Sequence, residues 1–279
     1  MLAVALGLAA SLSWGIADFI GGLKSRSLDL LAVLAGSQAV ALLLLLAAVG
    51  LRGEGPPDGE SLAYAAAAGA VGVAGLAAFY RGLSVGAMSV VAPIASLGAA
   101  VPVAVGVATG ERPSAFQVAG IALALTGVAL ASRENAPEGG GARTATGVGL
   151  ALAAAVGIGL FLTAMDVAGD GDVLWALLVA RLGSVALVVA AVLATRPDLA
   201  AARPHIRPIA AIGVLDMGAN GLFALAATEG LVSVAAVLSS LYPVVTILLA
   251  RSLLGERVRA VQGVGITLVL AGVVAIAGG

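Results

Sequence analysis

Five polar side chains interrupt long apolar stretches of this sequence, and their types suit proton exchange and ion recognition. Asp18 and Asp216 carry carboxylates that can take up a proton or bind a cation, and Arg181 carries a guanidinium that can bind an anion or neutralise a carboxylate. Asn220 follows Asp216 by one helical turn, and Tyr242 adds a ring and a hydroxyl. These residues are candidates for a substrate or proton pathway.

The sequence lacks the residues that several other kinds of functional site need. The sequence has no cysteine and a single histidine, His205, so it excludes a disulfide framework, an iron–sulfur cluster, a thiolate zinc site and a cysteine nucleophile. It also has no GxxxxGK[ST] loop for nucleotide phosphates. We expect no metal, no cofactor and no enzyme activity.

The composition indicates a membrane protein. Hydrophobic residues make up 61% of the 279 residues, charged residues 10%, and there are 39 glycines. A soluble fold of this length needs a larger polar shell, so much of this surface must contact the lipid bilayer. The formal charge of −1 and the absence of a long basic run argue against a nucleic-acid partner.

Ten apolar windows are each long enough to cross the hydrocarbon core of a bilayer as a helix. Charged or turn residues separate them, most clearly at 24–29, 52–60, 133–143 and 196–207. The first window lacks the basic start of a secretory signal, so we expect it to be retained as a span. The predicted spans are 2–23, 28–51, 61–82, 85–109, 113–132, 146–165, 173–195, 206–228, 231–252 and 258–278.

Basic side chains gather in one set of alternate loops. With ten spans, eleven lysines and arginines fall in one set of loops, and two, Arg52 and Arg112, fall in the other. Because basic loops stay in the cytoplasm, we expect both termini to lie outside it, in a bacterial inner membrane. The eleven are Lys24, Arg26, Arg81, Arg133, Arg143, Arg196, Arg203, Arg207, Arg251, Arg257 and Arg259.

The chain contains an internal repeat. A shift of 145 residues aligns Gly110-Glu111-Arg112 with Gly255-Glu256-Arg257, and the stretch from Gly110 to Ser132 keeps eleven identities in 23 positions. Each half has five spans, an odd number, so the second half must be inverted relative to the first. We therefore predict an all-α polytopic membrane protein with ten transmembrane helices in two inverted five-helix repeats, 1–132 and 146–279, joined by a cytoplasmic linker, 133–145.

Four motifs stand out: Tyr80-Arg81-Gly82-Leu83, the segment Met88 to Pro102, the Gly-Glu-Arg followed by a glutamine in each half, and Ser239-Ser240-Leu241-Tyr242-Pro243. Together they resemble motifs of the EamA family, which belongs to the drug/metabolite transporter superfamily. The resemblance covers nearly the whole chain and implies ten helices and secondary transport of small metabolites. Trp14-Gly15 resembles the start of the family's Trp-Gly motif, but Lys24 lies two positions late, and Gly98 stands at the place matched by Pro243.

An ionisable group inside a span is costly and needs a partner or a function. Asp18 shares a face of the first span with Trp14, and Asp216 lies midway along the eighth. Arg181, in the seventh span, cannot remain unpaired there, and we expect Asp216 or Asp18 to be its partner. Two interpretations stay open: these groups form a substrate and proton pathway, or they are polar contacts that lock helices together.

Prolines fall inside the fourth and ninth spans, which correspond to each other in the two repeats. Pro93, Pro102 and Pro243 each remove a backbone hydrogen bond and free a carbonyl one turn earlier. Interrupted helices at matching positions point to a central binding site. Prolines also kink membrane helices that bind nothing, so a purely structural role is the alternative.

Arg81 and Glu229 occupy matching positions in the two halves, at a shift of 148 residues. With the halves inverted, one charge is expected near each side of the membrane. We hypothesise that they act as reciprocal gate or interface charges. The alternative is that both are helix-end charges that face water.

Two glycine pairs match between the fifth and tenth spans. Gly120 and Gly127 correspond to Gly265 and Gly272, and a spacing of seven places each pair on one helix face. We expect these faces to pack, either within a monomer or across a homodimer. We interpret the Gly-Glu-Arg residues as tight turns whose glutamate favours the dipole of the next helix.

The sequence thus predicts a secondary active transporter that exports a small metabolite or drug-like solute by alternating access, with proton coupling as a further hypothesis. The alternative is an intramembrane enzyme or lipid-handling protein, for which the necessary histidine, carboxylate or metal clusters are scarce. A receptor or assembly subunit without transport is a third candidate, and the near absence of a soluble domain argues against it.

Overall fold

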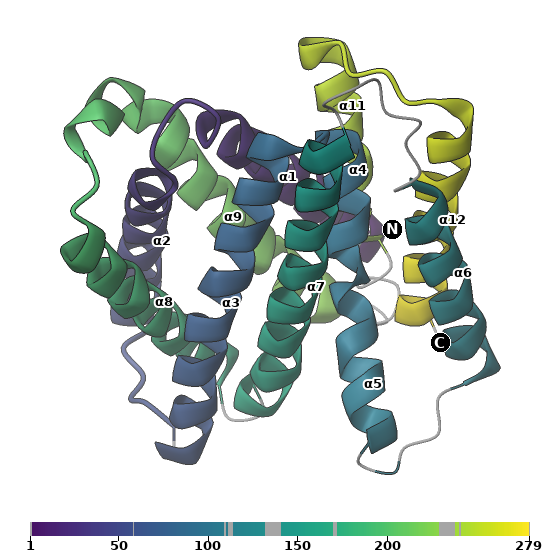
Figure 1. Cartoon of the computed structure of the whole chain (residues 1–279). Coiled ribbons are helices and arrows are strands. Elements are labelled where there is room, and N and C mark those ends of the chain that lie inside the picture. The colour runs from purple at the N-terminus through teal and green to yellow at the C-terminus, as the bar shows by residue number, and fades with distance from the viewer. Residues whose placement is uncertain are drawn as a thin grey trace.

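The computed structural model describes residues 2–57, 59–108, 110, 114–131, 141–169, 172–228, 238–239 and 241–278, and these residues form helices and no strand (Figure 1). The first half contains α1 (Leu2–Lys24), α2 (Leu30–Arg52), α3 (Gly59–Val85), α4 (Met88–Ala95), the 3₁₀ helix η1 (Ser96–Ala99), α5 (Ala100–Ala108) and α6 (Ala115–Ala131). The second half contains α7 (Gly141–Gly169), α8 (Val173–Thr195), the 3₁₀ helix η2 (Ala200–His205), α9 (Ile206–Thr228), α11 (Tyr242–Leu254) and α12 (Ala260–Gly278).

These helices match the ten predicted spans. The fourth span is divided into α4, η1 and α5, and α11 forms most of the described part of the ninth. In the described residues, α1, α2, α3, α7 and α8 are long and apolar enough to cross a membrane, and shorter apolar helices accompany them. The prediction of an all-helical polytopic membrane protein is confirmed.

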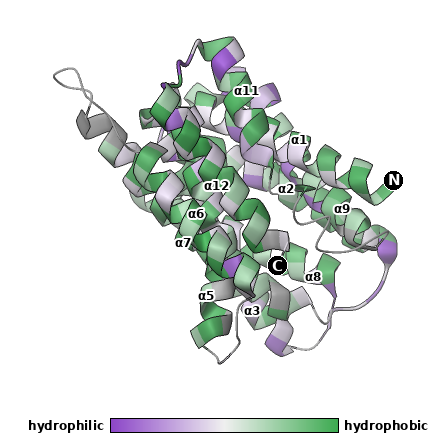
Figure 2. Ribbon diagram, turned by 90° about the vertical axis from the view of Figure 1, so that its right-hand side faces the viewer, coloured by the Kyte–Doolittle hydropathy of each residue, from purple (hydrophilic) through white to green (hydrophobic). Residues whose placement is uncertain are grey.

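Apolar side chains cover the outside of the bundle. Figure 2 shows hydrophobic residues along most of the helices and the strongly hydrophilic residues mainly at loops and helix ends. Leu51, Phe116 and Leu193 are 90%, 70% and 70% exposed, respectively. Large apolar side chains that face outward on so many helices indicate a surface that contacts lipid.

Polar contacts define two ends of the bundle. At one end, the Arg26 side chain reaches Glu256 and the carbonyl oxygen of Leu83. We call this the Arg26 end, and it includes the α1–α2 and α11–α12 loops and the start of α4. At the other, the Arg52 end, the Arg52 guanidinium pairs with the carboxylate of Asp172 between α7 and α8.

The two halves run in opposite directions. Helix α1 ends at the Arg26 end, because Arg26 lies just after it. Helix α7 begins the second half and ends at the Arg52 end, because Asp172 follows it. The first helix of each half therefore crosses the bundle with the opposite polarity, as an inverted repeat requires.

The halves interlock rather than lying side by side as separate units. Helix α1 packs on α9 and α11 of the other half, and α3 packs on α7 and α8. The packed core includes the buried side chains of Tyr80 and Met88 from the first half and of Ala154 and Ile212 from the second. Residues of both halves therefore face the middle of the bundle.

The matched glycines bring α6 and α12 together within one chain. A Cβ atom at Gly127 would lie 2.6 Å from the carbonyl oxygen of Gly265, and one at Gly272 would lie 2.5 Å from that of Gly120. Such distances leave no room for a side chain, so the two backbones meet directly. Of the two arrangements expected, the structure has the one within a monomer.

Candidate functional site

Arg181 is the centre of a polar node between three helices. Its guanidinium donates to the carboxylate of Asp216 on α9 at 2.8 Å and to the side-chain oxygen of Gln38 on α2 at 2.5 Å. It also contacts the sulfur of Met217 at 3.7 Å. Of the two carboxylates expected as its partner, Asp216 is the one that pairs with it.

Burial explains why Arg181 needs all of these partners. Its side chain is 13% exposed and that of Asp216 is 28% exposed, so neither charge is fully solvated. A charge inside an apolar bundle is tolerated when it is paired and its remaining donors are used. Gln38 takes up one of these donors without adding a charge, and so this node as a whole is neutral.

Asn220 lies one turn after Asp216, as predicted, but its amide group is partly occupied. Its Nδ2 donates to the backbone carbonyl of Asp216 at 2.7 Å. This bond fixes the side chain against its own helix and leaves the amide oxygen as an acceptor.

Asp18 differs from Arg181 and Asp216, because no described residue bonds to its carboxylate. The residue is 8% exposed, and in the described part of the chain its carboxylate has no hydrogen-bond or ion-pair partner. Asp216 lies within electrostatic range of it, and that charge has the same sign. A carboxylate that is buried without a partner is costly, which is a recurrent property of functional sites.

Aromatic side chains surround Asp18 on the face of α1 that turns inward. The rings of Trp14 on α1 and Phe223 on α9 lie 6.2 Å apart at 43°. The ring of Tyr80 on α3 covers Gly21, one turn after Asp18, and the carbonyl of Tyr242 on α11 lies 2.7 Å from a Cβ built at Gly15, one turn before it.

Two of these aromatic residues also bring free hydroxyls near the carboxylate. Tyr80 and Tyr242 both lie within electrostatic range of Asp18. Neither hydroxyl has a hydrogen-bond partner in the described residues. The centre of the bundle therefore holds a carboxylate and two hydroxyls with unused hydrogen-bonding capacity. Among the described residues, no group of three His, Cys, Asp or Glu side chains is placed to hold a metal ion.

At the Arg26 end, the Glu256 carboxylate caps a helix of the opposite half. Its carboxylate accepts hydrogen bonds from the backbone N–H groups of Met88 and Ser89, at 3.1 and 3.0 Å, and from the Ser89 hydroxyl at 2.8 Å. These N–H groups begin α4 and have no acceptor within their own helix. Arg26 joins the same carboxylate at 3.4 Å.

For Glu256, this contact corrects the sequence interpretation of the Gly-Glu-Arg turn, whereas Glu111 lies outside the described residues. The glutamate was expected to favour the dipole of the next helix, α12, but Glu256 caps α4 instead. The loop between α11 and α12 places it closer to that helix start, and the carboxylate neutralises the positive end of the α4 dipole.

Helix packing differs between the two repeats. At the Arg26 end, α1 meets α3 closely, since a Cβ at Gly22 would lie 2.5 Å from that of Leu83. The repeat relates α1 and α3 to α7 and α9, and among the described residues those two helices make no comparable contact. The two repeats thus differ in this contact: α1 packs on α3 at the Arg26 end, and α7 does not pack on α9 in the same way.

At the Arg52 end, a salt bridge links the two halves. The Arg52 guanidinium binds the carboxylate of Asp172, which also accepts from the backbone N–H of Trp175 at 2.9 Å and so caps α8. The hydrogen bond from Arg52 lowers the pKa of Asp172 below its ordinary value. The carboxylate therefore stays ionised at neutral pH.

Comparison with known proteins identifies the chain. The family model described as the EamA-like transporter family matches residues 1–133 and 145–278. The chain belongs to the EamA-like transporter family. A search of curated proteins finds no significant match. A solved structure titled only as the crystal structure of a protein has a TM-score of 0.65 and 16% identity to this chain, covering 98% of this chain and 95% of that one, which is a likeness of fold alone.

The prolines of this EamA-like transporter occupy different local settings. Pro93 lies inside α4, and the chain then passes through η1 before α5, where Pro102 stands in the first turn. Pro243 begins α11, where its missing N–H leaves no helical bond unmade. The fourth span is thus interrupted between Pro93 and Pro102, whereas Pro243 marks a helix start.

The proposed gate charges remain a prediction. Arg81 is exposed on the last turns of α3, near the Arg26 end. Glu229 lies outside the described residues. Their reciprocal role in the two halves is therefore untested.

The glutamine shared by the two repeats has a structural role. In the first half, the side-chain oxygen of Gln117 accepts from the N–H of Ser114 at 2.9 Å, and the Ser114 hydroxyl accepts from the N–H of Gln117. In the second, Gln262 accepts from the N–H of Arg259 at 3.2 Å. Both glutamines cap the start of their helices, in the manner of a capping box.

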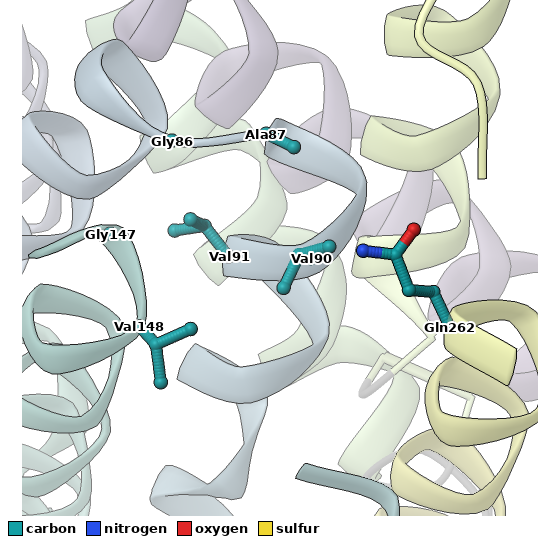
Figure 3. A pocket seen from close by; sticks show the side chains of 7 residues that line it. All are labelled: Gly86, Ala87, Val90, Val91, Gly147, Val148 and Gln262. Atoms are coloured by element: carbon teal, nitrogen blue, oxygen red, sulfur yellow. The ribbon is translucent and has the colours of Figure 1, made fainter. Parts of the chain in front are cut away.

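A small cavity at the Arg26 end is separate from the central polar groups. It lies between the starts of α4, α7 and α12, and Gln262 is the one side chain with an amide in its lining (Figure 3). It offers no charged group, so we do not assign the site to it. The lining residues are Gly86, Ala87, Val90, Val91, Gly147, Val148 and Gln262.

Two contributors to these contacts were missed in the sequence. Gln38 gave a signal, because it is an amide within the leucine-rich second span, where a polar side chain needs a partner. The sequence gave no signal that Glu256 caps α4, since only the fold brings residue 256 to residues 88 and 89.

Proposed function

We propose that this EamA-like transporter moves a small metabolite or drug-like solute across the bacterial inner membrane by alternating access. Export is the proposed direction, and transport rather than catalysis is the proposed activity. The observation that carries the proposal is Asp18, a buried carboxylate without a partner in the described residues, placed among side chains of both halves. A central group that both halves surround suits a site reached alternately from either side.

Proton coupling is the second part of the proposal. Asp18 can hold a proton when substrate is absent and release it when substrate arrives, because the neutral form costs less to bury. Asp216 is less suited to this role because Arg181 already pairs with it. We assign the exchangeable proton to Asp18.

The proposed topology places the Arg26 end in the cytoplasm and both termini outside it. The support is the excess of basic residues in the loops of that end. The tight packing of α1 on α3 and the Glu256 cap favour a conformation that is closed on the cytoplasmic side.

The topology can be tested directly because the chain contains no cysteine. Single cysteines at Ser27, in the α1–α2 loop, and at Gly55, in the α2–α3 loop, report opposite ends. A membrane-impermeant maleimide added to intact cells should label Gly55→Cys and spare Ser27→Cys. The reverse pattern would overturn the proposed orientation.

Transport is tested in two steps. Growth of deletion and overexpression strains across a panel of metabolites and drugs selects a solute, and its labelled form is then followed in proteoliposomes. Under an imposed pH gradient, the wild type should accumulate the solute and Asp18→Asn should not. Unchanged accumulation by Asp18→Asn would reject the proton role, and conversion of the solute into a product would favour the enzyme alternative.

A further inference from the structure

When Asp18 is ionised, the central groups carry an unbalanced negative charge. Asp18 and Asp216 are two carboxylates, and Arg181 is the guanidinium that pairs with Asp216. The groups near Asp18 on the helices packed against α1 are Tyr80 on α3, Asp216 on α9 and Tyr242 on α11. Among these groups of the described chain, none is a cation that pairs with Asp18.

An anionic ligand is disfavoured at this site. In the described part of the chain, the cation at the centre is Arg181, and it already donates to Asp216 and Gln38, at 2.8 and 2.5 Å. An anion would have to displace these partners and approach Asp18 as well. A cation needs neither change, and it would remove the cost of the unpaired carboxylate.

The side chains around Asp18 favour an organic cation with N–H groups. A protonated amine has several donors, which match the Asp18 carboxylate and the unpartnered hydroxyl oxygens of Tyr80 and Tyr242. The ring of Trp14 lies one turn before Asp18 on α1 and packs on the ring of Phe223, so it can attract a cation through its π face and accommodate its apolar part.

We propose that the Asp18 site binds organic cations that carry a protonated amine, through an ion pair with Asp18 between the aromatic side chains of α1, α3 and α11. This substrate class rests on the proposed transport function and narrows it to one class of solute. The proton assigned to Asp18 and the amine occupy the same carboxylate, so they exclude each other.

The chain offers an internal reporter for this binding. It has two tryptophans, and Trp14 lies one turn from Asp18, whereas Trp175 donates to the carbonyl of Glu54 at the Arg52 end. In a Trp175→Phe background, the fluorescence therefore comes from Trp14 alone. Three probes share one ring and differ in charge: phenethylammonium, 2-phenylethanol and phenylacetate.

The expected result is a saturable change of Trp14 fluorescence with phenethylammonium, at an affinity at least about tenfold higher than for the other two probes. Asp18→Asn should lower the affinity for phenethylammonium by about tenfold or more, because it removes the charge and keeps the volume. Asp29→Asn is the matched control: Asp29 is exposed and caps α2, and asparagine also caps, so binding should not change.

Equal binding of the alcohol or of phenylacetate by the wild-type reporter protein would overturn the proposal, whether or not Asp18→Asn folds. So would unchanged binding by a folded Asp18→Asn protein. Transport measurements separate the two proposals. If phenethylammonium binds through Asp18 but is not carried into proteoliposomes, the proposal that the protein transports this class of solute is rejected. The proposed binding site at Asp18 is then still supported. If a neutral or anionic solute is transported independently of Asp18, the proposed transport function is supported. The proposal that the substrates are organic cations is then rejected.

Discussion

The Glu256 carboxylate accepts hydrogen bonds from both the backbone N–H and the hydroxyl of Ser89, at 3.0 and 2.8 Å. The two residues are 167 positions apart and belong to opposite halves. One glutamate thus joins the turn before the last helix to the start of the fourth span, and Arg26 adds a positive charge beside it.

Removing this carboxylate should loosen the Arg26 end. Glu256→Ala leaves the first N–H groups of α4 without an acceptor and removes charge-assisted bonds that contribute about 1.5–3 kcal/mol. A cysteine at Met88, which is fully buried, should then react with a maleimide about tenfold faster or more.

The control for this experiment is the neighbouring residue. Arg257 is exposed, and Arg257→Ala in the same Met88→Cys background should leave the labelling rate unchanged. Equal acceleration by both variants would show that the loop, rather than the carboxylate, sets access to this end.

Breaking the Arg181 node should destabilise the protein. Arg181→Gln leaves the Asp216 carboxylate without its cation inside the bundle, and we expect a loss of about 2–4 kcal/mol of unfolding free energy. The measurement is denaturant unfolding in detergent. The double variant Arg181→Gln/Asp216→Asn should recover part of this loss, because it removes both charges. Additive losses in the double variant would contradict direct pairing.

The Arg52–Asp172 pair should make stability depend on acid pH. Because its folded pKa is lowered, Asp172 contributes stability above its unfolded pKa of about 3.9, and the contribution is lost as the pH falls through the lower folded pKa. Asp172→Asn should therefore lower the melting temperature at neutral pH, and its difference from the wild type should vanish well below pH ~4.

The repeat supplies a matched control for this experiment. Asp29 caps α2 as Asp172 caps α8, but in the described residues it has no ion-pair partner. Asp29→Asn should leave the melting temperature unchanged across the same pH range. A similar neutral-pH loss in both variants would indicate that capping, rather than the pair with Arg52, is responsible.

The contact between α6 and α12 should tolerate no added side chain at its centre. A methyl group at Gly272 would lie 2.5 Å from the carbonyl oxygen of Gly120, so Gly272→Ala should cost about 1–3 kcal/mol of stability. Gly149 on α7 has no atom within 4 Å of a Cβ position, so Gly149→Ala should be neutral or stabilising. Thermal unfolding in detergent compares the two, and equal stability of both variants would contradict the packing assignment.

Much of the fold could be predicted from the sequence because the bilayer limits the choices. A span must be apolar and about 20 residues long, and basic loops mark its ends, so Lys24, Arg52 and Arg196 separate helices much as expected. The repeat of the Gly-Glu-Arg motif and an odd number of spans in each half then require inversion.

The sequence was less informative about contacts. The sequence shows that Asp18, Arg181 and Asp216 are ionisable residues inside predicted spans. Which carboxylate pairs with Arg181 depends on how α8 and α9 are rotated, and in the structure it is Asp216. Pro243 shows the same limit, since a proline fits a helix start as well as a break and the local sequence does not distinguish them.

The cap on α4 has a consequence for how the two halves depend on each other. The first five-helix unit alone has an uncapped α4, because the acceptor comes from a turn of the second, oppositely oriented unit. The first half therefore depends on the second for the cap of one of its helices, and α1 and α3 also pack on helices of the second half. Severing the chain between positions 133 and 145 should therefore yield fragments that accumulate only when both are synthesised in the same cell.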